Sequence, residues 1–122
     1  MTDYERIGGE EALAEVVGAF VDRFFDDFII GFLFQGKDRD RIVRHEIEHA
    51  GRHLGGPLPY TGRGLKPVHA PLKINKGHFR RRLAIVAFVL REHGVPEDIV
   101  ERWITFEQKL EPTITTDRDC VE

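Results

Sequence analysis

A long irregular segment, residues 55–79 (GGPLPYTGRGLKPVHAPLKINKGHF), interrupts an otherwise helical chain of 122 residues. It contains four of the six prolines and five of the twelve glycines, residue types that break helices and favour turns. An irregular stretch of this length inside a compact domain is uncommon and is usually functional. One histidine, His69, lies near its middle among Val68, Ala70 and Leu72. We therefore predict that the segment wraps around a ligand and that His69 holds that ligand.

Apolar residues recur at three- and four-residue spacing on both sides of this segment, and this period predicts an all-α fold. In chain order, the predicted helical elements are residues 10–26, a tight and buried corner at 28–34, 38–54, a short piece near 65–70, 76–93 and 96–112. Asp38 or Asp40 is expected to cap the third element and Asn75 the central, nearly all-apolar one. Residues 2–7 are expected to form a short polar start, and residues 113–122 a polar tail.

The composition narrows the class of protein. A chain of 122 residues is long enough for one domain (residues 1–122) with a real core and one enclosed ligand. The formal net charge of −3 gives no indication of nucleic-acid binding. The single cysteine, Cys120, excludes an internal disulfide framework and is given no role. Because no leader and no apolar run of about 18 residues is present, we expect a cytoplasmic protein without a membrane anchor.

The predicted helix at 38–54 carries His45-Glu46-Ile47-Glu48-His49, which matches the HExxH pattern of zinc proteases. In that pattern the two histidines bind zinc and the glutamate activates water, and His53 could add a third nitrogen. A zinc hydrolase is therefore one hypothesis, although one long loop in a short chain offers little room for a substrate cleft.

A helical wheel divides this helix into two neighbouring stripes. The core stripe consists of Val43, Ile47, Ala50 and Leu54. The second stripe is mostly polar and consists of Ile42, Glu46, His49 and His53, with His45 further round at its edge. We expect His53 and Glu48 on a solvated face. Glu46 and His49 border the core stripe, so they fit either solvent or an internal pocket.

A series of short motifs, in order from residue 4 to about residue 115, resembles the truncated haemoglobins, and more specifically the first group of that family. The motifs are Tyr4-Glu5-Arg6-Ile7-Gly8-Gly9, Leu33-Phe34-Gln35-Gly36, Leu54-Gly55-Gly56-Pro57, Tyr60-Thr61-Gly62-Arg63, Val68-His69-Ala70, His78-Phe79 and Gly94-Val95-Pro96. The resemblance implies a globin-like, two-over-two helical sandwich around a haem b. It also implies binding of dioxygen or nitric oxide, and oxygen transport as a role.

The resemblance also implies site residues, carried over by position. His69 corresponds to the axial iron ligand, which binds through neutral imidazole. Phe34 corresponds to an aromatic residue that packs on the porphyrin. The positions that pair with the haem propionates are Arg41, Tyr60 and Lys66. Further haem contacts are implied at Phe20, Ile42, His45, Ala50, Leu65, Ile74 and Phe79.

On the distal side, where the diatomic ligand binds, the chain departs from the family. Many members place a tyrosine where this chain has Val21, a glutamine at Glu46 and a phenylalanine at His49, while the pocket entrance is apolar at Ile42. Val21 cannot donate a hydrogen bond, and Glu46 donates only when protonated. We therefore do not expect the tight retention of dioxygen that a distal tyrosine provides.

Three further interpretations remain open. His45 is either a sixth iron ligand, which requires a helix shift, or a partner of a propionate at the pocket rim. Glu46 and His49 form a candidate proton-transfer pair, so a haem enzyme acting on nitric oxide, nitrite or peroxide is the second hypothesis. The basic cluster Lys76, Arg80, Arg81 and Arg82 is either a docking surface for a reductase or a solvated helix start. No feature of the sequence indicates the oligomeric state.

Overall fold

The computed structural model describes residues 1–57 and 74–115, and these two ranges are helical without strands. The elements are α1 (Asp3–Ile7), α2 (Gly9–Asp26), the 3-10 helix η1 (Gly31–Phe34), α3 (Arg39–His53), α5 (Lys76–Glu92), α6 (Glu97–Gln108) and α7 (Glu111–Ile114). The predicted helical piece near 65–70 lies outside the described residues. No helix among those described is long and apolar enough to cross a membrane.

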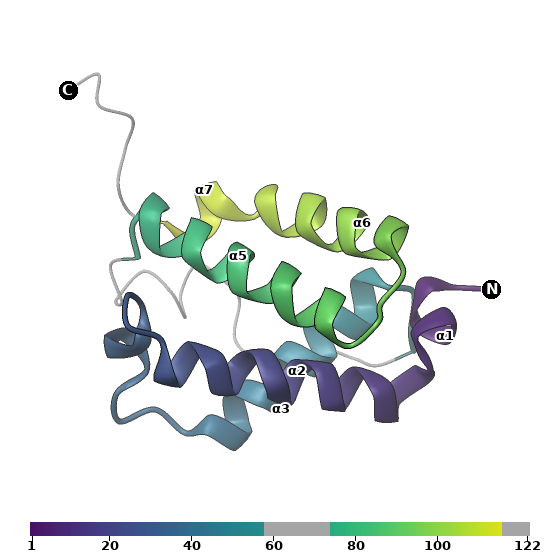
Figure 1. Cartoon of the computed structure of the whole chain (residues 1–122), viewed down its shortest axis with the longest axis horizontal. Coiled ribbons are helices and arrows are strands. Elements are labelled where there is room, and N and C mark those ends of the chain that lie inside the picture. Colours follow the sequence, from purple (N-terminus) through teal and green to yellow (C-terminus); the bar gives the residue numbers. More distant parts are fainter. Residues whose placement is uncertain (58–73, 116–122) are drawn as a thin grey trace.

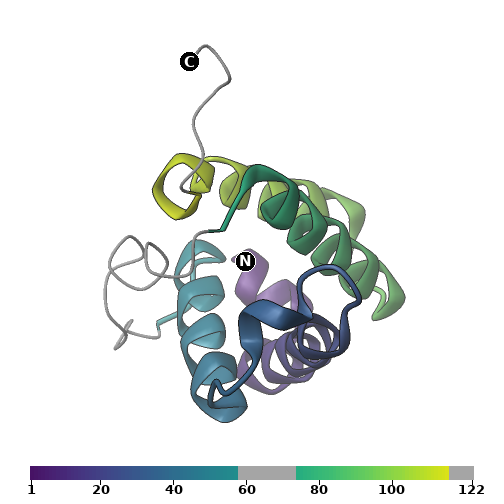
Figure 2. The ribbon, with the colours of Figure 1, turned by 90° about the vertical axis from the view of Figure 1, so that its left-hand side faces the viewer.

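Four long helices form two layers (Figure 1). α2 and α3 make up one layer, and α5 and α6 the other, as the view along the helices in Figure 2 shows. The principal contacts join α2 to α3, α2 to α5 and α5 to α6. This arrangement confirms the predicted all-α, two-over-two sandwich.

The core follows from the apolar period of α2. All five residues predicted on its inner face are buried, namely Leu13, Val16, Val17, Phe20 and Phe24. Trp103 of α6 is fully buried and meets Phe20 edge-on, with ring centroids 6.2 Å apart. Burying a large apolar side chain contributes about 1.5–3 kcal/mol, so this cluster holds the two layers together.

The two ends of the chain differ from their predicted form. Residues 3–7 are helical because Thr2 and Glu5 form a capping box, which satisfies two backbone N–H groups reciprocally. At the other end, α6 already ends at Gln108, and a separate helix, α7, follows. Ile114 of α7 is buried against Phe79 and Leu83, so the prediction of a polar tail from residue 113 is wrong there.

The corner after α2 has the predicted helical form, but the prediction that it is buried is wrong for most of it. Ile30 is 2% exposed, whereas Phe28 and Phe32 are 99% and 56% exposed. Asp27 stabilises the corner because its carboxylate accepts hydrogen bonds from the backbone N–H groups of Ile29 and Ile30.

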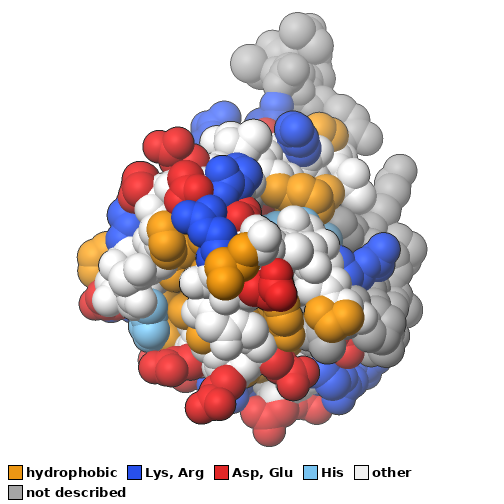
Figure 3. All heavy atoms as spheres, turned by 90° about the vertical axis from the view of Figure 1, so that its right-hand side faces the viewer, with side chains coloured by type: hydrophobic (Ala, Val, Ile, Leu, Met, Phe, Trp, Pro, Cys, Tyr) orange, Lys and Arg blue, Asp and Glu red, His pale blue; other side chains and the backbone are white. Residues whose placement is uncertain are grey.

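Ion pairs join α1 to the start of α6. Arg6 donates to Asp98 (2.7 and 3.1 Å), and Arg102 donates to Asp3 (2.8 and 2.9 Å) and to Asp98 (2.8 Å). Figure 3 shows this end of the molecule, where basic and acidic side chains interleave on the surface. The network anchors α1 against the second layer.

Candidate functional site

A buried ionic network crosses three helices of the sandwich. Arg82 of α5 donates two hydrogen bonds to Glu46 of α3, from Nη1 to Oε2 (2.7 Å) and from Nη2 to Oε1 (2.9 Å). Its other edge faces Glu107 of α6, with Nε donating to Oε1 (2.9 Å) and Nη2 to Oε2 (3.2 Å). Both carboxylates are thus held in bidentate pairs, the strongest geometry for arginine and a carboxylate.

The network extends to Trp103, whose indole Nε1 donates to Oε2 of Glu107 (3.0 Å). Burial opposes the charge of Arg82, but the carboxylates of Glu107 and Glu46 together hold the pKa of its guanidinium well above the ordinary value. The trio therefore carries one positive and two negative charges. A guanidinium in a bidentate pair favours the ionised form of its partner, so this arrangement disfavours Glu46 as a proton donor.

The network lies beside the aromatic residue predicted to pack on the porphyrin. The Arg82 guanidinium lies over the ring of Phe24, 5.1 Å from its centroid, and Phe24 stacks on Phe34 with centroids 5.6 Å apart. A continuous chain of contacts therefore connects Phe34 with Glu46, the residue predicted on the distal side.

The histidines of α3 pack against α6. His53 stacks on Phe106 with ring centroids 4.3 Å apart and meets Trp103 edge-on at 5.3 Å. The prediction that His53 lies on a solvated face is therefore wrong, because α6 covers that side of α3. Burial, together with the neighbouring His49, lowers the pKa of His53 to about 4.

His49 contacts the same aromatic ring, with its centroid 5.7 Å from that of Phe106. Burial lowers the pKa of His49, although Glu46 and Glu107 oppose this shift. Its imidazole is therefore neutral at neutral pH. Across residues 1–57 and 74–115, no group of three or more His, Cys, Asp or Glu side chains could hold a metal ion. The zinc hypothesis thus lacks a third ligand within that part of the chain.

The other predicted site residues of the described ranges divide by exposure. Phe20, Val21, Ala50 and Phe79 are buried in the core. Phe34, Ile42, His45 and Ile74 are half-buried, and Arg41 is exposed at the start of α3. Half-buried apolar side chains beside an exposed guanidinium suit a flat, amphipathic cofactor with anionic propionates, so these residues fit a haem. Tyr60, Leu65, Lys66 and His69 lie outside the described residues.

Arg82 and Glu107 were not predicted as site residues. Arg82 belongs to the run Arg80–Arg82, which was interpreted as a reductase-docking surface or a solvated helix start. Its spacing from Phe79 and Val86 on α5 nevertheless places it on the buried face, and this period is the signal that could have found it. Within that run, Arg81 is also engaged, donating to Asp27 at 2.7 Å, so the predicted basic surface is smaller than the sequence indicates.

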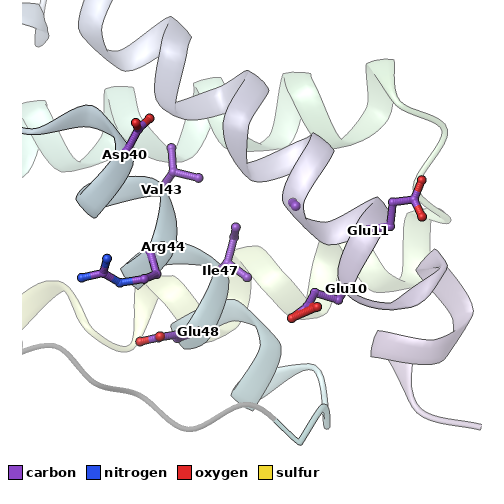
Figure 4. Close-up of a pocket in the computed structure, with 8 residues that line it drawn as sticks. Glu10, Glu11, Asp40, Val43, Arg44, Ile47 and Glu48 are labelled. Atoms are coloured by element: carbon purple, nitrogen blue, oxygen red, sulfur yellow. The ribbon is translucent and has the colours of Figure 1, made fainter.

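A separate surface hollow of about 560 Å³ lies between α2 and α3. Its lining consists of Glu10, Glu11, Ala14, Asp40, Val43, Arg44, Ile47 and Glu48. Figure 4 shows Val43 and Ile47 pointing toward α2, while Arg44 and Glu48 point away from it. The hollow contains none of the predicted site residues.

Comparisons with known proteins agree with this architecture. A family model described as bacterial-like globin matches residues 2–116. The chain is 36% identical over 113 residues to a group 1 truncated haemoglobin of Mycolicibacterium paratuberculosis, a match that covers 93% of this chain and 83% of that protein.

Solved structures show the same fold. The truncated haemoglobin of Tetrahymena pyriformis in its Fe(III) form is similar with a TM-score of 0.89 and 23% identity, covering 96% of this chain and all (100%) of that one. The haemoglobin of Chloroflexus aurantiacus is similar with a TM-score of 0.83 and 26% identity, covering 96% and 99%. A 2/2 haemoglobin of a Synechococcus species, with covalently attached heme, has a TM-score of 0.82 and 21% identity, covering 88% and 91%.

Proposed function

Because the chain belongs to the truncated haemoglobins of the bacterial-like globin family, we propose that it holds a haem b through His69 and reversibly binds dioxygen or nitric oxide. Membership of the family implies the haem and the small diatomic ligand. The choice of ligand, the b type of the haem and the residues of the site are parts of the proposal. The haem iron supplies the bond to the diatomic ligand, and the protein supplies orientation, burial and electrostatics.

The observation that carries the proposal is the set of half-buried residues Phe34, Ile42 and His45, together with the exposed Arg41 at the start of α3. Apolar Ile42 and Phe34 would exclude water from the ligand side of the cofactor, and Arg41 would pair with a propionate at the rim. His45, half-buried at the edge of α3, is proposed as a second propionate partner or as a sixth iron ligand. On the ligand side the buried Val21 offers no donor.

Absorption spectroscopy of the purified protein tests this proposal. We expect a Soret band in the haem-loaded protein and its loss or broadening in His69→Ala. The control is His93→Ala, an exposed histidine outside the proposed site. A protein that takes up no haem, or a His69→Ala variant with an unchanged spectrum, would refute the proposal.

Extraction with acidified acetone addresses the type of haem. Haem b is released by this treatment because only non-covalent contacts and the iron bond hold it. Haem that stays with the polypeptide would instead indicate a covalent bond, as in the Synechococcus protein.

Chemistry on nitric oxide, nitrite or peroxide is the second candidate function. Its support is that Glu46 and His49, both half-buried, lie one turn apart on the same helix. The ion pair with Arg82 holds Glu46 as a carboxylate, so His49 is the more suitable proton acceptor of the two. Stopped-flow mixing with nitrite or peroxide should give a lower rate in His49→Phe than in wild type. Equal rates in wild type, His49→Phe and Glu46→Gln would remove this candidate.

A further inference from the structure

The guanidinium of Arg82 has one hydrogen-bond donor left over. Arginine has five N–H groups, and four of them are directed to Glu46 and Glu107. Nη2 uses both of its hydrogens and Nε uses its only one, whereas Nη1 donates only to Glu46. The second hydrogen of Nη1 has no acceptor within residues 1–57 and 74–115.

The exposure of the network shows on which side this donor lies. The side chain of Glu107 is 4% exposed, whereas those of Arg82 and Glu46 are each 19% exposed. The network is therefore closed toward α6 and open toward α3. Nη1, which bonds only to Glu46, belongs to the open side, and the guanidinium carbon lies over the ring of Phe24, which in turn stacks on Phe34.

Stability alone does not explain why the chain keeps three charges there. Desolvating a buried ion pair offsets much of its attraction, and apolar side chains of similar volume are often equally stable or better. The two carboxylates do, however, fix the guanidinium plane at both edges, which prepares a donor to act without reorganisation.

Building on the proposed function, we propose that Arg82 is the hydrogen-bond donor to the diatomic ligand and takes the role that Val21 cannot fill. Glu46, Glu107 and Trp103 are positioning residues, because they hold the guanidinium and leave one N–H of Nη1 available. A ligand that accepts hydrogen bonds well, such as dioxygen, is then retained in preference to carbon monoxide, which accepts them poorly.

The test compares haem-loaded wild type, Arg82→Met and the matched control Arg81→Met. Arg81 is the adjacent arginine on α5, but its side chain is 42% exposed and it pairs with Asp27. In Arg82→Met we expect dioxygen to dissociate about ten- to a hundredfold faster, because this is the change in rate that the loss of one hydrogen bond to a charged group produces. Carbon monoxide dissociation should change about twofold at most in both variants, since that ligand accepts only weak hydrogen bonds.

The infrared stretching frequency of bound carbon monoxide is a second readout that a purely structural role would not move. It falls when positive potential near the ligand increases, so it should rise in Arg82→Met. In Glu46→Gln it should fall, because the guanidinium loses a compensating charge. Shifts of opposite sign in these two variants are the expected result.

Several outcomes would overturn the inference. If Arg82→Met and Arg81→Met have the same dioxygen dissociation rate, Arg82 is not the donor. If Arg82→Met does not fold, the double variant Arg82→Met/Glu107→Gln restores the trio's original net charge of −1 and must show the same faster dissociation. An unchanged or raised frequency in Glu46→Gln contradicts the inference independently. A wild-type protein without a Soret band refutes the proposed function itself, whereas a haem-loaded wild type with an unaffected Arg82→Met refutes only the role of Arg82.

Discussion

Arg82→Met should strongly destabilise the fold, and adding Glu107→Leu should restore part of the loss. The single change removes four hydrogen bonds and leaves two carboxylates without their shared cation, one of them on a side chain only 4% exposed. Removing one partner of a buried ion pair costs about 3–5 kcal/mol. This is a large share of the roughly 5–15 kcal/mol that stabilises a typical domain.

The other single variant, Glu107→Leu, has a different cost. It leaves the indole N–H of Trp103 without its acceptor and removes one of the two carboxylates that balance the charge of Arg82. A buried hydrogen-bond donor that is left without an acceptor lowers the free energy of unfolding by about 1–3 kcal/mol. In the double variant no carboxylate remains at position 107, and Glu46, which is 19% exposed, can regain water.

Urea unfolding followed by far-UV circular dichroism, at fixed haem saturation and pH 7, measures all four free energies of unfolding. We expect the double variant to lose at least about 2 kcal/mol less than the sum of the two single losses. Arg81→Met is the control and should lose much less stability than Arg82→Met, since its ion pair is largely exposed on the arginine side. If the stability lost by the double variant equals the sum of the two single losses to within about 0.5 kcal/mol, the claim that the network acts as a unit is refuted.

Three further predictions concern titration and close packing. Because burial lowers the pKa of His53 to about 4 from an ordinary 6.5, unfolding binds a proton between these values. Stability should therefore be complete above pH 6.5 and fall by about 2–3 kcal/mol toward pH 4, and His53→Phe should flatten this slope in urea titrations. The ion pair with Arg81 and the backbone N–H groups of its corner lower the pKa of Asp27 to about 2. That contribution is present above pH 3.8 and lost toward pH 2, and Asp27→Asn should cost about 1–2 kcal/mol at pH 7. Gly56→Ala should cost about 1–3 kcal/mol in thermal unfolding, because a Cβ there would lie 2.6 Å from the Tyr4 ring.

Each of these predictions has a matched control. His93→Phe, at an exposed histidine, should lose stability between pH 6.5 and pH 4 as the wild type does. If His53→Phe shows the same fall in stability, His53 is not its cause. Asp26→Asn, at the exposed neighbouring aspartate, should change stability by less than about 0.5 kcal/mol. Gly18→Ala lies inside α2, where the new Cβ would be 3.6 Å from Arg39, and should stabilise by up to about 1 kcal/mol. A Gly56→Ala variant as stable as wild type would contradict this prediction, because the Tyr4 ring would then move aside for the new Cβ without a cost in stability.

The apolar period was sufficient to predict the long helices and the buried face of α2, whereas on α3 it missed the packing of His53 against α6. Leu13, Val16 and Phe20 recur at helical spacing, and a helix with such a stripe has to bury it. Short elements were less predictable. Residues 3–7 and 111–114 have no apolar period of their own, and they are stabilised by a capping box and by burial of Ile114.

The corner after α2 shows that a dense apolar run does not by itself predict burial. The run Phe28–Phe34 is dense in apolar residues, and hydrophobicity alone predicts that it is buried. In the structure the corner meets the core through Ile30 and Phe34, whereas Asp27 and the 3-10 turn direct Phe28 and Phe32 outward.

The sequence by itself determined the helical class, the order of the motifs and the family to which the chain belongs. It also contained the spacing that places Arg82 on the buried face of α5. Only the tertiary structure decided what that arginine meets, because Glu46 and Glu107 are 36 and 25 residues away along the chain. A buried charge persists only where packing brings opposite charges into hydrogen-bonding distance. That pairing depends on how α3 and α6 dock on α5, and no local pattern in the sequence encodes it.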